Sequence, residues 1–76
     1  MAMIFYTQCK LKRGTSWMVS IIPDRYAVKG KILKLKDAEG NWEDGWEVMD
    51  TYTKFPEDVA LHNEMLWRHH REATDI

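Results

Sequence analysis

Residues 26–49 read YAVKGKILKLKDAEGNWEDGWEVM and contain two runs in which apolar and charged residues alternate. Leu33 and Leu35 alternate with lysines in the first run, and Trp46 and Val48 alternate with other residues in the second. A period of two places successive side chains on opposite faces of a strand. The turn-forming sequence DAEGN separates the runs. We therefore predict a β-hairpin with a long connection, its apolar side chains facing the core and its charges facing outward.

Two more strands are predicted ahead of this hairpin, at residues 4–12 and 17–22. Gly14 lies in the short turn between them, so the two strands are close enough to pair as a hairpin. Pro23 ends the second strand because proline cannot donate a ladder hydrogen bond. Residues 50–55 are ambiguous, and their Tyr and Thr content is compatible with a short fifth strand.

The alternation in the first two strands also predicts which side chains are buried. A domain of this length has a small core, which holds about two of the four tryptophans. We expect Trp17 and Trp46 to be those two. Val19 and Ile21 share the face of Trp17, and the first strand presents Phe5, Cys9 and Leu11.

The C-terminal part of the chain predicts one long helix at residues 56–73. Pro56 suits the first helical position, because its missing N–H would have no partner there. Glu57 and Asp58 follow in the first turn, where the helix dipole favours acids. Neither Gly nor Pro interrupts the rest of the segment. We expect residues 74–76 to form a loose tail or to dock on a partner.

Length and composition indicate one small domain. The chain has 76 residues, 45% of them hydrophobic, which is enough to build a modest core. Its one cysteine, Cys9, has no disulfide partner within the chain, which fits a reducing compartment. The first residues lack a basic n-region, so we expect no signal peptide. No run approaches the roughly 18 apolar residues that a membrane span requires.

The net charge of −1 hides a strong asymmetry between the two halves of the chain. Residues 1–38 carry eight Lys or Arg and two acids, whereas residues 39–76 carry three Lys or Arg and ten acids. One interpretation is a basic face for nucleic acid or for an acidic partner protein. The other is that the halves lie side by side and screen each other, as oppositely charged strands do across a sheet.

No arrangement of residues predicts catalysis, a metal or a cofactor. His62 and His69 are seven residues apart, rather than the i, i+4 spacing that places two ligands one helical turn apart, and His70 follows directly. Cys9 has no motif that supplies a base or an oxyanion site. The paired acids fall in a turn and a helix start, where solvated carboxylates are expected. We therefore predict that the protein is not an enzyme.

Four or five short strands with tight turns, followed by one helix, predict a mainly β domain built as a small half-open antiparallel barrel. Residues 28–35 and 45–48, in which a Gly precedes one strand and Gly-Trp opens the next, look like the pattern of SH3-like barrels. The length and the order of these elements predict a single domain over residues 1–76, with the barrel at 1–55, the helix at 56–73 and the tail at 74–76.

More of the chain resembles a group of small uncharacterised tailed-bacteriophage proteins. The likeness is carried by QCKL (8–11), IP (22–23), VKGK (28–31), GWEV (45–48) and RHHREATDI (68–76). It implies a phage-encoded protein located in the cytoplasm of a bacterial host or in the virion. That group has no established activity to transfer. The longer acidic insert at residues 37–44 departs from the group's pattern, so any specificity that it carries is peculiar to this chain.

A nucleic-acid interface is one binding hypothesis. A basic sheet face with aromatic residues can follow a phosphate backbone and stack bases, and Tyr6 shares the outward parity of the first strand. The acidic half and the pI of about 6.3 oppose it. The alternative is a solvated face that protects the sheet from aggregation. The candidate residues are Lys10, Lys12, Lys34 and Lys36.

A protein interface is the second hypothesis and the one we favour. The chain contains four Trp, three Tyr, two Phe and five Met, which are many aromatic and methionine side chains for so small a domain. Trp42 lies in the acidic insert and Trp67 lies off the apolar side of the predicted helix, so we do not expect either of them in the core. Exposed Trp and Met are typical interface anchors. The alternative is that both fold back onto the barrel. The candidate interface residues are Trp42, Trp67, Met49, Glu43 and Asp44.

Taken together, these patterns predict a non-catalytic protein-binding or assembly module that modulates a host or phage protein. Two alternatives remain, a minor structural component of the phage virion and a nucleic-acid-binding SH3-like domain. The charge asymmetry also permits a homo-oligomer. No membrane association is expected.

Overall fold

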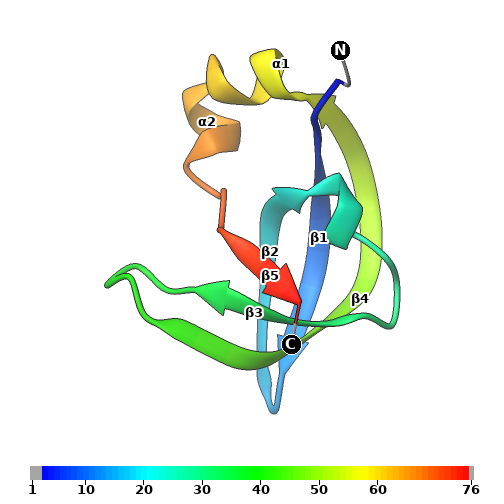
Figure 1. Cartoon of the computed structure of the whole chain (residues 1–76), viewed down its shortest axis with the longest axis vertical. Coiled ribbons are helices and arrows are strands. Elements are labelled where there is room, and N and C mark those ends of the chain that lie inside the picture. Colours follow the sequence, from blue (N-terminus) through cyan, green and yellow to red (C-terminus); the bar gives the residue numbers. More distant parts are fainter. Residues whose placement is uncertain (1–2, 76) are drawn as a thin grey trace.

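The chain folds as five antiparallel strands in one open sheet, with two short helices at one end (Figure 1). The computed structural model describes residues 3–75. The strand order is β2-β1-β4-β3-β5. The elements in chain order are β1 (Phe5–Arg13), β2 (Ser16–Pro23), a 3₁₀ turn η1 (Asp24–Tyr26), β3 (Ile32–Lys36), β4 (Trp42–Pro56), α1 (Glu57–Leu61), α2 (Glu64–Trp67) and β5 (Ala73–Asp75).

The central hairpin and its burial pattern are confirmed. β3 pairs with the first half of β4, and Leu33, Leu35 and Val48 have no exposed surface. Trp46 is 6% exposed and belongs to the same hydrophobic cluster. Each side chain alternates with an outward neighbour, as a period of two requires. The rest of the buried cluster comes from β1 and β2: Cys9, Leu11 and Ile22.

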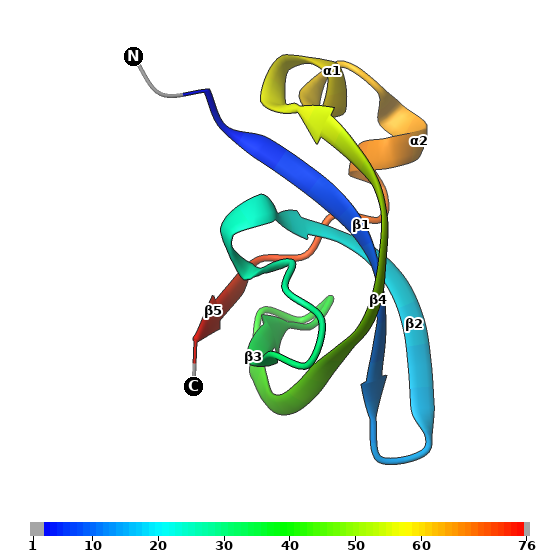
Figure 2. The ribbon, with the colours of Figure 1, turned by 90° about the vertical axis from the view of Figure 1, so that its right-hand side faces the viewer.

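Strand β4 is long and strongly curved, so that one strand serves two partners (Figure 2). Its first half pairs with β3 and its second half with β1. The register shifts in both ladders, and each shift leaves an extra residue on β4. Such bulges bend a strand and increase its twist. Gly45 lies at the bulge facing β3 with a φ of 89°, a conformation that glycine adopts without steric penalty. Residues 50–55 therefore continue β4 rather than forming a separate strand.

The predicted inward face of β2 is wrong. Trp17 and Val19 are 50% and 45% exposed, whereas Ser20 and Ile22 are buried. Of the predicted face only Ile21 is buried, at 1% exposed, where the segment around His70 pairs with it. The cause is the turn between β1 and β2, which places Leu11 opposite Met18. Opposite residues in an antiparallel pair lie on the same face of the sheet, so the inward parity of β1 selects Met18, Ser20 and Ile22.

The predicted helix at residues 56–73 is also wrong. Its start is right to within one residue: α1 begins at Glu57, and Pro56 is the extended N-cap rather than the first helical residue, with two acids in the first turn. It ends at Leu61, and Asn63 takes an extended conformation as the N-cap of α2. The Asn63 side chain accepts hydrogen bonds from the backbone N–H groups of Met65 and Leu66. An asparagine that caps the next turn offers the backbone an alternative to a continuous helix.

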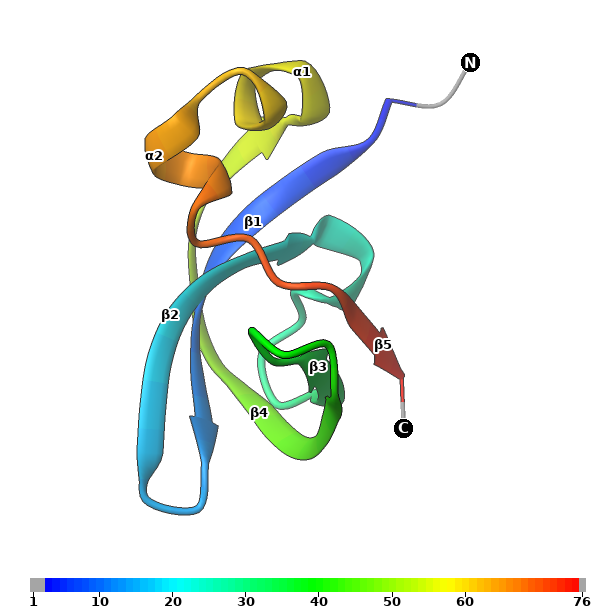
Figure 3. The same ribbon diagram turned by 90° about the vertical axis from the view of Figure 1, so that its left-hand side faces the viewer.

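After α2 the chain is extended and connects the two edges of the sheet (Figure 3). Ile21 of β2 donates to the carbonyl of His69 and accepts from the N–H of Arg71. The carbonyl of Glu72 then accepts from the N–H of Lys36, and β5 pairs with β3. The expected tail at residues 74–76 is therefore part of an edge strand up to Asp75, and Ile76 lies outside the described residues.

The two oppositely charged halves of the chain lie side by side. Every ion pair found within residues 3–75 joins a residue of the first half to one of the second. These pairs are partly exposed, so each contributes little to stability by itself, but together they screen the asymmetry of the sequence. The pairs are Arg13–Glu43, Lys31–Asp75, Lys34–Asp44, Lys36–Glu72 and Lys54–Asp24.

Candidate functional site

An aromatic groove lies where the helices, the start of β1 and the C-terminal segment meet. Its volume is about 440 Å³, which is within the usual range for binding sites in proteins. Side chains from widely separated parts of the chain form its walls. They are Tyr6, Pro23, Arg25, Trp42, Leu61, Trp67, His70, Glu72 and Ala73. A second hollow of about 330 Å³ continues from it along Leu61 and Trp67.

Three aromatic rings pack together in one wall of this groove. The Trp67 and His70 rings are stacked, with centroids 4.0 Å apart and planes inclined by 6°. Tyr6 meets both rings edge-on, at centroid distances of 5.5 Å to Trp67 and 5.4 Å to His70. Edge-to-face and offset-stacked pairs of this kind add to the stability that burial supplies. The three rings therefore form one continuous aromatic wall.

The environment of the groove changes the pKa of two of these rings. Burial lowers the pKa of His70, and the nearby carboxylate of Glu72 opposes this only in part. Burial also raises the pKa of Tyr6, with a further increase from Glu57 and an opposing effect of Arg25. Both effects favour the uncharged ring. At neutral pH the wall therefore presents neutral aromatic surface.

Trp42 belongs to the opposite part of the groove and is held by charged neighbours. It is 46% exposed and pairs with Lys36 across the hairpin. The ammonium group of Lys36 lies 5.6 Å from the centre of the Trp42 ring and 3.1 Å from a carboxylate oxygen of Glu72. A cation over an aromatic face adds a modest attraction at an exposed site. The indole is therefore positioned while much of its surface stays open to solvent.

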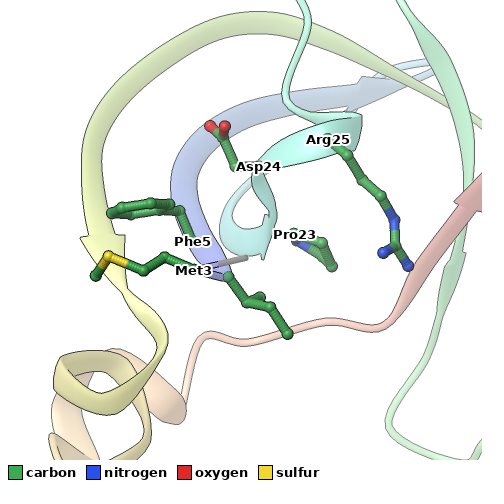
Figure 4. Close-up of a pocket in the computed structure, with 6 residues that line it drawn as sticks. Met3, Phe5, Pro23, Asp24 and Arg25 are labelled. Atoms are coloured by element: carbon green, nitrogen blue, oxygen red, sulfur yellow. The ribbon is translucent and has the colours of Figure 1, made fainter. Parts of the chain in front are cut away.

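Arg25 and Pro23 separate the groove from a smaller apolar hollow of about 230 Å³. Figure 4 shows Arg25 extending on the opposite side of Pro23 from Phe5. The turn η1 carries Arg25, and it is attached to β1 by a hydrogen bond of 2.6 Å from the Thr7 hydroxyl to Asp24. This attachment holds the turn that carries Arg25, the only Lys or Arg among the residues that line the groove.

The structure brings together some of the predicted interface residues but not all of them. Trp42 and Trp67 are far apart in sequence, yet they line the same groove. Glu43 instead pairs with Arg13 at 3.7 Å, and Asp44 pairs with Lys34 at 3.7 Å. Met49 is partly buried at a bulge of β4. None of these three lines the groove.

The four predicted lysines do not form one free basic surface. Lys34 and Lys36 have carboxylate partners in Asp44 and Glu72. Lys10 and Lys12 lie on the outer face of β1, and their ammonium groups lie over the exposed Trp17 ring at 4.7 and 4.9 Å from its centre.

Acidic residues also lie beside Lys10 and Lys12. Lys10 is opposite Asp50 and Lys12 is opposite Glu47 on β4. Close carboxylates reduce the attraction of such a face for phosphate.

Several groove residues were not predicted. Tyr6 was assigned only to the outward face of β1, and Arg25 and Glu72 were not singled out. No pattern in the sequence predicts their convergence, because it depends on the C-terminal segment crossing from β2 to β3. The exposure of Trp17, in contrast, follows from the two-residue turn at residues 14–15 once Leu11 is taken as buried.

Cys9 and His62 lie outside the groove, and in the described part of the chain neither belongs to a cluster that could hold a metal ion. Cys9 has no exposed surface, and burial raises the pKa of its thiol to about 11, with a smaller contribution from Asp24. A thiol in this state is a poor nucleophile. His62 is exposed, with Nδ1 2.8 Å from the backbone oxygen of Asp58. No group of three or more His, Cys, Asp or Glu side chains within residues 3–75 is arranged to hold a metal ion.

Comparison of the chain with protein-family models, with curated proteins and with solved structures found no match. Among the helices of residues 3–75, none has the length and apolar character needed to cross a membrane. The function is therefore inferred from the geometry of the groove.

Proposed function

We propose that this chain is a non-catalytic protein-binding or assembly module that holds a segment of a partner protein in the aromatic groove. The observation that carries the proposal is the convergence of Trp42 and Trp67, two tryptophans left over from the core, on one groove. Tryptophan and arginine are enriched among the residues that contribute most to protein interfaces, and both line this groove.

The chemistry of the groove favours a partner segment with apolar side chains. Neutral rings form one wall, and Leu61 and Ala73 add further apolar surface. Arg25 and Glu72 contribute opposite charges at the rim. Such a site gains most of its affinity from burying apolar area and uses the rim charges to orient the partner.

The proposal also includes an SH3-like fold and a phage origin for the chain. A strongly curved antiparallel sheet, whose edges are connected by the C-terminal segment, supports the SH3-like identity that the hairpin pattern indicates. The resemblance to tailed-bacteriophage proteins supports a phage-encoded module that acts on a host or phage protein in the bacterial cytoplasm. A minor component of the virion is the alternative within the same class of binding function.

Nucleic-acid binding is the second candidate function. The observation that favours it is the exposed Trp17 ring with the ammonium groups of Lys10 and Lys12 at 4.7 and 4.9 Å from its centre. An aromatic ring close to cations is suited to stacking a base beside its phosphate. We place it second because Asp50 and Glu47 lie directly opposite these lysines.

The test is recovery of a partner from bacterial lysate with the wild type, Trp42→Ala and Trp67→Ala. Trp17→Ala is the matched control, because Trp17 and Trp42 are about equally exposed but lie on different surfaces. We expect a partner that both groove variants lose and that Trp17→Ala retains. Equal recovery by all four proteins would refute the groove as the site. Loss with Trp17→Ala alone, together with nuclease sensitivity, would favour the nucleic-acid candidate.

A further inference from the structure

Strand β2 is an edge strand without the usual protection against pairing with another strand. Its sequence, SWMVSIIP, contains no charged residue, whereas each of the other four strands contains at least one. Its ladder with β1 has no bulge. Natural sheets protect exposed edges with charges, bulges or covering segments. β2 has none of these between its start and the bridge of Ile21 to His70.

The backbone groups of Trp17 and Val19 point toward this open edge. In an antiparallel pair, alternate residues direct both backbone groups toward the partner strand or away from it. Ile21 bonds outward, to His69 and Arg71, so Val19 and Trp17 at the same parity also direct their N–H and C=O away from β1. Within residues 3–75, no other strand pairs with β2 there. Figure 3 and Figure 2 both show β2 at the margin of the molecule.

We propose that this edge pairs with β2 of a second copy of the chain, antiparallel and around a two-fold axis at Met18. In that register Trp17 lies opposite Val19 of the second copy, and Val19 lies opposite its Trp17. Each pair exchanges both of its hydrogen bonds, so all the outward groups between the turn and the His70 bridge find partners.

The side chains fit the same register. Trp17 and Val19 are both about half exposed on the outer face, and an aromatic residue opposite a β-branched residue is a favourable cross-strand pair. β2 itself carries no charge, and the ammonium groups beside its Trp17 belong to Lys10 and Lys12 of β1. A two-fold contact of this kind is closed and does not propagate into fibres. This self-association does not depend on the proposed function of the groove.

One short strand buries less surface than the roughly 800 Å² that each partner contributes to a standard stable interface. We therefore expect a weak dimer that forms as the concentration rises. This expectation sets the concentration range of the test and distinguishes the contact from an obligate interface.

The test is sedimentation velocity of the wild type and two Val19 variants from about 10 µM to about 1 mM, the range expected for a weak interface. Val19→Pro removes an N–H that points away from β1, so the ladder within the chain keeps its hydrogen bonds. Val19→Lys places a charge at the edge. Val28→Lys is the matched control, because Val28 is 55% exposed and lies outside the strands. Near-UV circular dichroism checks that each variant is folded.

We expect the average mass of the wild type and Val28→Lys to rise with concentration, and both Val19 variants to dimerise at least about tenfold more weakly. Hydrogen exchange of the Trp17 and Val19 amides slows as the wild type associates, whereas the Met18 and Ser20 amides, which bond to β1, are protected at all concentrations. A wild type that stays monomeric overturns the proposal, as does association that survives in both Val19 variants. Association that Trp42→Ala abolishes would assign the contact to the groove and also overturn it.

Discussion

A partly buried hydrogen bond between Thr7 and Asp24 attaches the turn η1 to the sheet, and Thr7→Val tests its contribution to stability. Thr7 is 4% exposed, and its Oγ1 donates to Oδ1 of Asp24 at 2.6 Å. The other carboxylate oxygen of Asp24 lies 3.1 Å from Nζ of Lys54. Because η1 carries Arg25 into the groove, this hydrogen bond also positions a residue of the candidate site.

Valine keeps the shape and the β-branch of threonine but removes the donor. A hydrogen bond to a charged group contributes about 1.5–3 kcal/mol. The Asp24 side chain is 38% exposed, so water replaces part of the interaction, and we expect the lower end of that range, about 1.5 kcal/mol. At roughly 4–8 °C per kcal/mol for a domain of this size, the melting temperature falls by about 6–12 °C.

The effect of Thr7→Val depends on pH. The hydrogen bond from Thr7, followed by the interaction with Lys54, holds the pKa of Asp24 below its ordinary value. A lowered carboxyl pKa stabilises the fold fully above the unfolded pKa of about 4 and loses that contribution as the pH falls through the folded pKa. The difference between wild type and variant is therefore largest at neutral pH and shrinks in acid.

Urea denaturation of both proteins at neutral and acidic pH measures these quantities. Thr53→Val, at an exposed position of β4, is the matched control, and we expect it to lie within about 0.5 kcal/mol of the wild type. A double-mutant cycle with Asp24→Asn isolates the coupling between the two side chains. A Thr7→Val protein as stable as the control, or a difference that does not shrink in acid, would refute this account of Asp24.

Three further predictions concern the helices, the groove and the core. Asn63→Ala removes the side-chain cap of α2 and is expected to lower the free energy of unfolding by about 1 kcal/mol, whereas Asn63→Asp retains most of it. The ring protons of His70 are expected to titrate below the ordinary histidine range in NMR spectra. Since the fold favours the neutral ring, stability declines as the pH falls from about 6.5 through the folded pKa, and His70→Gln removes this decline. Cys9 is expected to resist a thiol reagent at mildly alkaline pH until the protein unfolds.

Each of these predictions has a contrary result. Equal unfolding midpoints for Asn63→Ala and Asn63→Asp would show that the cap does not stabilise α2. An ordinary titration midpoint for His70 would contradict its burial against Trp67. Rapid stoichiometric labelling of Cys9 in the folded protein would contradict its place in the core.

Much of the candidate site could not be predicted from sequence because its walls come from distant segments. Trp42 and Trp67 lie outside the buried cluster, as expected, but so does Trp17, which was expected in the core. The convergence of Trp42 and Trp67 with Tyr6 depends on where α2 ends and where the following segment crosses the sheet. Local periodicity contains no information about such a crossing.

The sequence by itself determined the alternation of β1, β3 and β4, and with it the burial of Leu11, Leu33, Leu35, Trp46 and Val48. A period of two is a local property, and a small core leaves few other positions for these side chains. The start of α1 was also predictable, because Pro56 and the acids after it act through local backbone chemistry.

Local alternation left the buried face of β2 undecided, and only the tertiary structure decided where the helical segment ends and how the sheet edges are connected. Both parities of β2 are largely apolar, so the pairing of Leu11 with Met18 selects the inward face. Residues 69–75 have helix-forming neighbours, but the backbone groups of Ile21 and Lys36 at the sheet edges bond to residues 69–72 and would lack these partners if the helix continued. Satisfying those groups favours an extended segment over the last turns of a helix, because buried backbone groups without partners are strongly destabilising.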